Sequence, residues 1–192
     1  MAAVIIGLCG LKSSGKSTAA QYLRDSKNFV ICSFAAPIKG MLWEFLHEQG
    51  VPDTTIHKML NGEFKETPSD ALCGQTPRHA MQTLGTEWGR DLMSPNFWTN
   101  AWKRRIALLN KVVVDDVRFQ SEVDTIRGLG GTCIRINRPS LESDIHPSES
   151  GIHALHDLKY TVENDKDFLQ FFEQLRLIMD IELHKGPGPG EP

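Results

Sequence analysis

The sequence lacks an excess of positive charge. Its 192 residues include 21 Lys and Arg against 24 Asp and Glu, so the formal net charge is −3 at pH 7. Binding of duplex nucleic acid needs a broad basic surface. We therefore expect no nucleic-acid partner, and any positive charge that serves function must be concentrated locally.

Paired cysteines and long apolar runs are also missing. None of the 4 cysteines forms a C-x-x-C pair, and three of them lie in or beside apolar, strand-like runs, which is typical of reduced, buried thiols in a cytosolic protein. The apolar run near the N-terminus is too short to cross a bilayer, and the basic segment of a signal peptide is absent. We expect a cytoplasmic protein with no membrane partner.

Internal repeats are absent as well, and short apolar runs alternate with amphipathic stretches. Strands are predicted at residues 4–9, 29–34, 111–114, 132–136 and 160–162. Helices are predicted at residues 17–24, 38–49, 78–92 (interrupted near its two glycines), 96–109, 122–129 (closed by a Gly-Gly cap) and 167–181. This alternation predicts an α/β fold, a three-layer sandwich of a mostly parallel sheet and flanking helices in one domain over residues 1–185. Residues 50–77 are expected to be irregular with short helices, and residues 186–192 a disordered tail.

One short stretch carries a phosphate-binding pattern. Residues 10–17, GLKSSGKS, match G-x-x-x-x-G-K-[ST] in full, with a predicted strand before them and a predicted helix after. The glycines allow the backbone to curl so that N–H groups converge, and the helix N-terminus adds partial positive charge. The pattern predicts ATP or GTP binding with Mg²⁺, and a glycine-rich turn that binds nothing is the alternative. The nucleotide-binding residues are Gly10, Lys12, Ser13, Ser14, Gly15, Lys16, Ser17 and Thr18.

A second signal is VVVDDVRF at residues 112–119, an apolar strand that ends in acids. P-loop proteins hold magnesium through a carboxylate at such a position. Asp115 and Asp116 alternate faces, so only one is expected to point at the phosphates, and two solvated acids remain the alternative. Arg118 is placed to face the same cleft.

Two further segments supply polar groups. In residues 76–92, two arginines bracket Gln and Thr, which can bind a base edge, and Trp, which can stack on it. An ordinary amphipathic helix is the alternative there. The polar loop 135–149 carries Arg138 and is interpreted either as a lid that brings an arginine to the transferred phosphoryl group or as a simple surface loop.

Missing elements narrow the chemistry further. The guanine-binding N-K-x-D pattern is absent, since NDKD at residues 164–167 has the letters in another order, and this disfavours a GTPase. No general base is evident in the sequence. A nucleoside monophosphate is already largely ionised at neutral pH, because its second pKa is about 6. Its kinase mainly needs positioning and charge neutralisation.

Together these segments resemble the phage-type deoxynucleoside monophosphate kinases. The resemblance rests on the P-loop and on SFAAPIKGML, QTLGTEWGRDL with NFW, VVVDDVRFQSEVDTI and HPSE, in that order over residues 4–150. It implies transfer of the γ-phosphoryl group of ATP to a dNMP, with a dNMP-binding insert at about residues 38–105 and a lid at about 137–157. If the gene belongs to a phage, the location is the host cytoplasm.

The resemblance also assigns roles to single residues. Implied catalytic residues are Lys16, Asp116, Arg118 and Arg138. Implied substrate-binding residues are Lys39, Arg78, Gln82, Thr86, Trp88, Arg90, Trp98, Asp116, Arg118 and Glu122. Ser17 and Asp115 are implied to hold Mg²⁺.

Two alternatives stay open. Another small-molecule P-loop kinase, such as a dephospho-coenzyme A kinase, has a similar sheet, but Arg78 and Arg90 favour an acceptor that already carries phosphate. An ATP-dependent binding module would need no acceptor. We further expect a ring such as Phe34 or Trp43 to pack against C2′ of the sugar and favour deoxy substrates, and the aromatic residues at 88–102 to be compatible with a homodimer.

Overall fold

The computed structural model describes residues 3–139 and 151–184. The predicted tail and most of the predicted lid lie outside these residues, so both stay predictions. The chain splits into two compact units: residues 1–33 with 103–192, called the sheet unit here, and residues 34–102, called the helical unit. None of the helices in the described part of the chain has the length and apolar character needed to cross a membrane.

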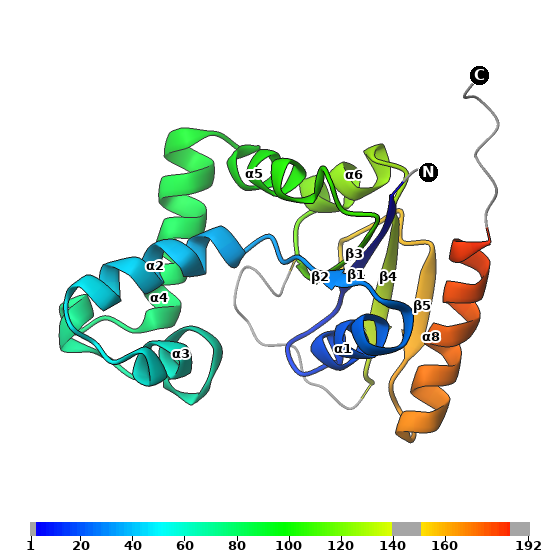
Figure 1. Cartoon of the computed structure of the whole chain (residues 1–192), viewed down its shortest axis with the longest axis horizontal. Coiled ribbons are helices and arrows are strands. Elements are labelled where there is room, and N and C mark those ends of the chain that lie inside the picture. The colour runs from blue at the N-terminus through cyan, green and yellow to red at the C-terminus, as the bar shows by residue number, and fades with distance from the viewer. Residues whose placement is uncertain (1–2, 140–150, 185–192) are drawn as a thin grey trace. The chain divides into compact units, whose positions relative to one another are not determined.

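The sheet unit is built on a parallel sheet with the order β2-β3-β1-β4-β5 (Figure 1). The strands are β1 (Val4–Cys9), β2 (Val30–Ile31), β3 (Lys111–Val117), β4 (Thr132–Asn137) and β5 (Tyr160–Glu163). Among the described residues, the helices wholly within this unit are α1 (Lys16–Lys27), α6 (Gln120–Gly128) and α8 (Phe168–Leu183). The predicted α/β fold with a parallel sheet is confirmed. Because β1 is central, the loop after it lies at the middle of the carboxyl edge, where ligands bind in such sheets.

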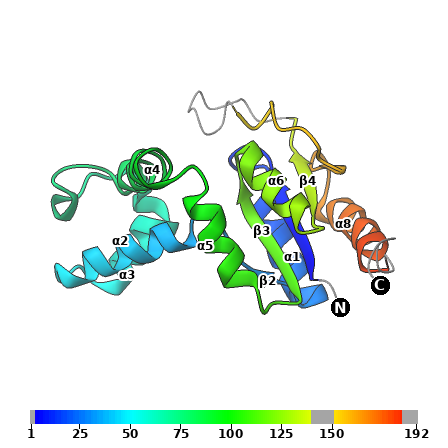
Figure 2. The ribbon, with the colours of Figure 1, turned by 90° about the horizontal axis from the view of Figure 1, so that it is seen from above.

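Alternate residues of β1 face opposite layers, as a strand period of two requires. Ile6 and Leu8 are fully buried in the cluster that α1 and α8 cover. Gly7 faces α6, and a Cβ on it would lie 2.7 Å from Ile126 Cδ1. Helices α1 and α6 accordingly lie on opposite sides of the strands, while α8 lies toward the β5 edge of the sheet (Figure 1 and Figure 2).

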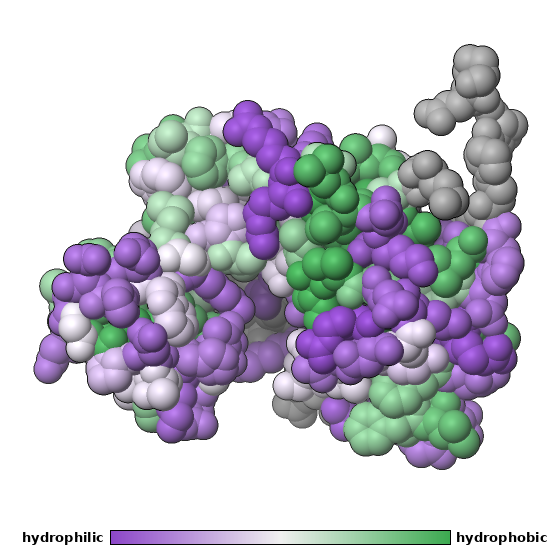
Figure 3. Space-filling model, viewed as in Figure 1, coloured by the Kyte–Doolittle hydropathy of each residue, from purple (hydrophilic) through white to green (hydrophobic). Residues whose placement is uncertain are grey.

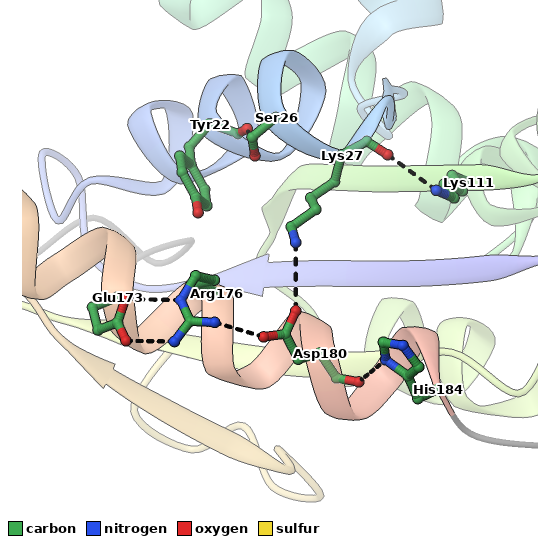
Figure 4. A network of polar contacts seen from close by, with 8 residues as sticks. All are labelled: Tyr22, Ser26, Lys27, Lys111, Glu173, Arg176, Asp180 and His184. Carbon is green, nitrogen blue, oxygen red and sulfur yellow. Dashed lines mark hydrogen bonds and ion pairs between the residues drawn. The ribbon is translucent and has the colours of Figure 1, made fainter.

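Polar contacts tie α8 to the end of α1. Lys27 Nζ donates to Asp180 Oδ1 across 3.4 Å, and Lys111 Nζ donates to the backbone oxygen of Lys27 across 3.2 Å. On α8 itself, the Arg176 guanidinium lies between Glu173 and Asp180 (Figure 4). The Arg176 pairs are exposed and fix geometry rather than add much stability, since such pairs contribute about 0–1 kcal/mol each.

The Gly-Gly pair closes α6 as predicted. Gly130 has φ 78°. Its N–H donates to the oxygen of Arg127, and the N–H of Gly131 donates to the oxygen of Ile126, each across 2.9 Å. This double pattern is a Schellman cap, which requires the left-handed conformation that glycine adopts without strain.

The helical unit contains α2 (Ala36–Glu48), α3 (Asp53–Asn61), α4 (Pro77–Thr83), the first part of α5 (Phe97–Ile106), and two short 3-10 turns, η1 (Glu63–Glu66) and η2 (Asp70–Leu72). After α4 the chain continues as a π-helix, η3 (Leu84–Met93). The sequence predicted that the helix is interrupted near Gly85 and Gly89. The structure shows instead that the helix continues there with π-helical winding.

The core of the helical unit contains Ile38, Leu42, Leu46, Ile56, Met59, Leu60 and Trp98.

Candidate active site

The phosphate-binding loop runs from the end of β1 to the first residue of α1. Gly10 and Gly15 have φ of 150° and 108°, and Ser13 has φ 64°. A Cβ on Gly10 would lie 2.3 Å from the oxygen of Ile136, and one on Gly15 would lie 2.6 Å from Asn164 Nδ2. Glycine is required at both places by close approach, and the result is a curled backbone at the start of a helix, which is the arrangement that binds phosphate.

Lys16 is folded back onto this loop. Its Nζ donates to the backbone oxygens of Gly10 and Leu11, each across 2.7 Å. A bound triphosphate offers oxygens with higher negative charge, so the ammonium group can exchange carbonyl partners for phosphate partners.

Two side chains hold the loop from outside. Arg138 Nη1 donates to the oxygen of Ser13 across 3.2 Å, and Asn164 Nδ2 donates to the oxygen of Ser14 across 2.8 Å. In a trans peptide the C=O and the following N–H point in opposite directions. Holding the carbonyl of Ser14 in this way turns the N–H of Gly15 to the other side of the peptide, whereas the N–H of Ser14 donates to the oxygen of Leu11 across 3.1 Å. The hydroxyl of Ser14 is buried and finds no hydrogen-bond partner among the described residues.

A pocket of about 530 Å³ opens over the loop. It is lined by Ser13, Gly15, Lys16, Ser17, Thr18, Arg138, Asn164, Asp165, Lys166, Asp167 and Phe168. The structure thus brings six of the predicted residues together, whereas Gly10, Lys12 and Ser14 shape the loop and do not line the pocket. Sequence reasoning missed residues 164–168, although the polar run between the last strand and the last helix was a signal for them. The pocket-lining residue Phe168 is the first residue of α8 and is 67% exposed. Exposed apolar side chains gather on the surface at this end of the helix (Figure 3).

The two acids Asp115 and Asp116 lie within β3, whereas the sequence predicted them at the end of a strand. The strand does not end at Asp115 or Asp116, because it continues to Val117, which pairs with Cys9 of β1. Ser33 Oγ donates to Asp115 Oδ1 across 2.6 Å. Ser33, which the sequence did not single out, therefore orients the acid that was predicted to hold Mg²⁺. Asp116 is half-buried, and its predicted role stays a prediction.

Glu122 is buried at the start of α6. Its Oε2 accepts the backbone N–H of Arg118 across 2.8 Å and that of Phe119 across 3.2 Å. These bonds cap the helix and fix the turn that carries Arg118. The contact of Glu122 with substrate stays a prediction, and the structure adds a capping role to it.

Burial makes the thiols in and beside the sheet unreactive. Burial raises the pKa of Cys9, directly before the loop, to about 11 and the pKa of Cys133 to about 12. Burial also raises the pKa of Cys32. These three are buried free thiols, as expected from their apolar surroundings, whereas Cys73 is exposed. A neutral thiol is a poor nucleophile, so none of the buried cysteines is a candidate catalyst.

The predicted acceptor residues belong mostly to the helical unit. Arg78 is paired with Glu66, and Lys39 Nζ donates to Asn61 Oδ1 across 2.8 Å. Arg90 Nη1 donates to the oxygen of Gly85 across 3.0 Å. Gln82, Thr86 and Trp88 lie on the same α4–η3 segment as the two arginines.

The large rings of this unit are mostly interior. Trp98 is 3% exposed and Trp102 is fully buried, so the aromatic residues at 88–102 offer less exposed surface than the homodimer prediction assumed. Phe34 is 3% exposed and packs on Trp102, with ring centroids 4.7 Å apart. Trp43 packs against the core of the unit. The expected contact of Phe34 or Trp43 with C2′ stays a prediction.

This fold is shared with solved structures that include a kinase. A shikimate kinase from Aquifex aeolicus matches with a TM-score of 0.51 and 14% identity, covering 95% of this chain and 100% of that chain. The structure of TT1252 from Thermus thermophilus matches with a TM-score of 0.54 and 15% identity, covering 97% and 100%. At such identities the likeness defines the fold class, an α/β P-loop fold.

Sequence comparison defines the family. A family model described as deoxynucleotide monophosphate kinase matches residues 72–175. A protein of Acanthamoeba polyphaga mimivirus with the name "Putative deoxynucleotide monophosphate kinase" is 38% identical over 92% of this chain and 96% of its own length. The deoxynucleotide monophosphate kinase of Enterobacteria phage T4 is 32% identical over 54% of this chain and 45% of its own length. The chain belongs to the deoxynucleotide monophosphate kinase family.

Proposed function

We infer that the protein is an ATP-dependent kinase of deoxynucleoside monophosphates, which transfers the γ-phosphoryl group of ATP to the acceptor and yields ADP and a dNDP. One observation carries this inference: family membership over nearly the whole chain. The curled loop over the 530 Å³ pocket supports it, because it offers N–H groups and Lys16 to a triphosphate. Family membership therefore favours phosphorylation of a dNMP over the two alternatives, a dephospho-coenzyme A kinase and an ATP-dependent binding module.

The donor half of the chemistry belongs to the sheet unit. Lys16 neutralises charge on the transferred phosphoryl group, and N–H groups of the loop and of the first turn of α1 hold the phosphates. Mg²⁺ bound at this site would supply further charge neutralisation. The hydroxyl of Ser17 and the carboxylate of Asp115 fit as its ligands, because both present the oxygen donors that Mg²⁺ prefers.

The acceptor half needs arginine more than it needs a base. A monophosphate with a second pKa of about 6 is already ionised at neutral pH and attacks without losing a proton. Arg78 and Arg90 would bind that phosphate, with Gln82, Thr86 and Trp88 toward the base. Arg118 and Arg138 would neutralise charge as the phosphoryl group moves. We propose that this occurs in the cytoplasm, where both nucleotides are present, and a homodimer stays a prediction.

An ADP-release assay with each dNMP tests this function. ADP should appear only when both ATP and a dNMP are present. Replacing Arg90 by Ala should raise the KM for the dNMP about tenfold or more, as loss of a charge-assisted hydrogen bond does, and leave the KM for ATP unchanged. Arg24→Ala, which removes an exposed pair with Asp25 on α1, is the matched control and should alter neither constant. Absence of turnover with every dNMP would refute the function, and an unchanged KM in Arg90→Ala would refute the site.

A further inference from the structure

The backbone oxygen of Gly85 accepts hydrogen bonds from two side chains. Trp98 Nε1 donates to it across 2.7 Å, and Arg90 Nη1 donates to it across 3.0 Å. A carbonyl oxygen has two lone pairs and can serve both donors. Gly85 lies near the start of the π-helix η3, and π-helical winding occurs mostly as single turns inside α-helices, which are frequent at functional sites. A ten-residue π-helix that carries a predicted phosphate-binding arginine therefore requires an explanation.

Gly89 has no side chain, and this makes room for the indole of Trp98. A Cβ on Gly89 would lie 2.3 Å from Trp98 Nε1 and 2.5 Å from its Cε2. The indole ring therefore occupies the space that any other residue at position 89 would fill. Trp98 comes from α5, so its contact with Gly85 and Gly89 joins two helices within the helical unit.

Burial limits what Trp98 can do. At 3% exposure it offers no free face on which a base could stack. Its N–H and Arg90 meet at one oxygen, so the position of that oxygen affects both side chains.

We propose that Trp98 is a positioning residue for the acceptor phosphate and not a substrate contact. The indole fills the place beside Gly89, holds the carbonyl of Gly85, and through that carbonyl fixes the direction of the Arg90 guanidinium. This inference rests on the proposed function, in which Arg90 binds the phosphate of the dNMP. The π-helical winding is then the device that presents the carbonyl of Gly85 to both donors.

The test is a pair of matched substitutions on α5. Trp98→Phe keeps an aromatic ring and removes the N–H, and Trp102→Phe makes the same change one turn later at another buried position. Trp98→Phe should raise the KM for the dNMP about fivefold, the effect of one net hydrogen bond, with the KM for ATP unchanged. Trp102→Phe should leave the ratio of the two KM values as in the wild type. Equal effects of the two variants on that ratio would overturn the proposal.

A second measurement needs no activity and no core substitution. In the isotope-labelled wild-type protein, the indole N–H of Trp98 should exchange slowly with solvent, and its resonance should move in Arg90→Ala because the shared oxygen loses one donor. A resonance that exchanges rapidly or does not move would overturn the proposal even if Trp98→Phe fails to fold. Absence of dNMP turnover in the wild type would instead refute the proposed function, so the two failures are distinguishable.

Discussion

At the scale of single residues, the phosphate-binding loop is held by partners distant in sequence. Asn164 is 150 positions from Ser14, and Ser33 is 82 positions from Asp115. The sequence showed the loop itself because all its determinants are contiguous. It did not show Asn164 or Ser33 as partners, because their roles depend on which strand ends lie beside each other at the carboxyl edge of the sheet.

Replacing Asn164 tests whether the loop depends on this outside support. Asn164→Ala should raise the KM for ATP about fivefold to tenfold, since one hydrogen bond that orients the cradle is lost. Asn164→Asp should be worse, because a carboxylate would face the oxygen of Ser14. The matched control is Asn137→Ala, which removes a side-chain bond to Glu163 and keeps the backbone contact with Asn164. Steady-state kinetics at varied ATP concentration measure these KM values. Equal KM values in Asn164→Ala and the wild type would contradict the role of Asn164 in holding the loop.

Thiol reactivity tests the environment of the strands. Brief treatment of the native protein with iodoacetamide at about pH 8 should modify Cys73 alone, because the other thiols are buried and their raised pKa values keep them protonated. After denaturation all 4 cysteines should react. Peptide mass spectrometry identifies the sites. Rapid modification of Cys9 in the native protein would show that the loop and β1 open far more than the structure indicates.

At the scale of elements, the predicted strands were right in place and less accurate at their ends. The sequence predicted a strand over 29–34, but β2 forms only Val30–Ile31 at the sheet edge, where it pairs with β3 on one side. In contrast, β3 runs past its predicted end at residue 114 because β1 continues to pair with it. Strand length is decided by the neighbouring strand, which periodicity along one segment does not describe.

Helix α8 also depends on a buried carboxylate that periodicity did not reveal. Glu182 Oε1 accepts from Lys159 Nζ across 2.9 Å and from the Tyr160 hydroxyl across 2.8 Å. Its Oε2 accepts from Thr132 Oγ1 across 2.7 Å. One acid therefore joins the last helix to the beginnings of β4 and β5.

Replacing Glu182 by Leu should lower the free energy of unfolding by about 2 kcal/mol or more, because buried donors lose their acceptor. Glu173→Gln, on the exposed side of α8, should change it by less than about 0.5 kcal/mol. Urea denaturation measures both, and a Glu182→Leu protein as stable as the wild type would contradict the anchoring role. The KM for ATP should be unchanged, since Glu182 lies near the C-terminal end of α8, whereas Phe168 lines the pocket from the first turn of that helix.

At the scale of the whole molecule, the predicted site residues are divided between the two units. The loop residues, Arg138 and the acids of β3 belong to the sheet unit, and Arg78 and Arg90 belong to the helical unit. The sequence predicted this organisation of functions through its resemblance to a family, whereas the alternation of strands and helices indicated only an α/β fold and residues 10–17 only a nucleoside triphosphate site. Substitution of Arg78 or Arg90 should therefore change the KM for the acceptor, and substitutions at the loop should change the KM for ATP.

Label transfer tests the central claim most directly. The protein is incubated with ATP that carries a radiolabelled γ-phosphate, with each dNMP, each NMP, dephospho-coenzyme A, or no acceptor, and the products are separated by chromatography. The account predicts label in a dNDP, with deoxy acceptors converted at higher kcat/KM than their ribo counterparts. Label that appears only in inorganic phosphate, at a rate that no dNMP changes, would contradict it.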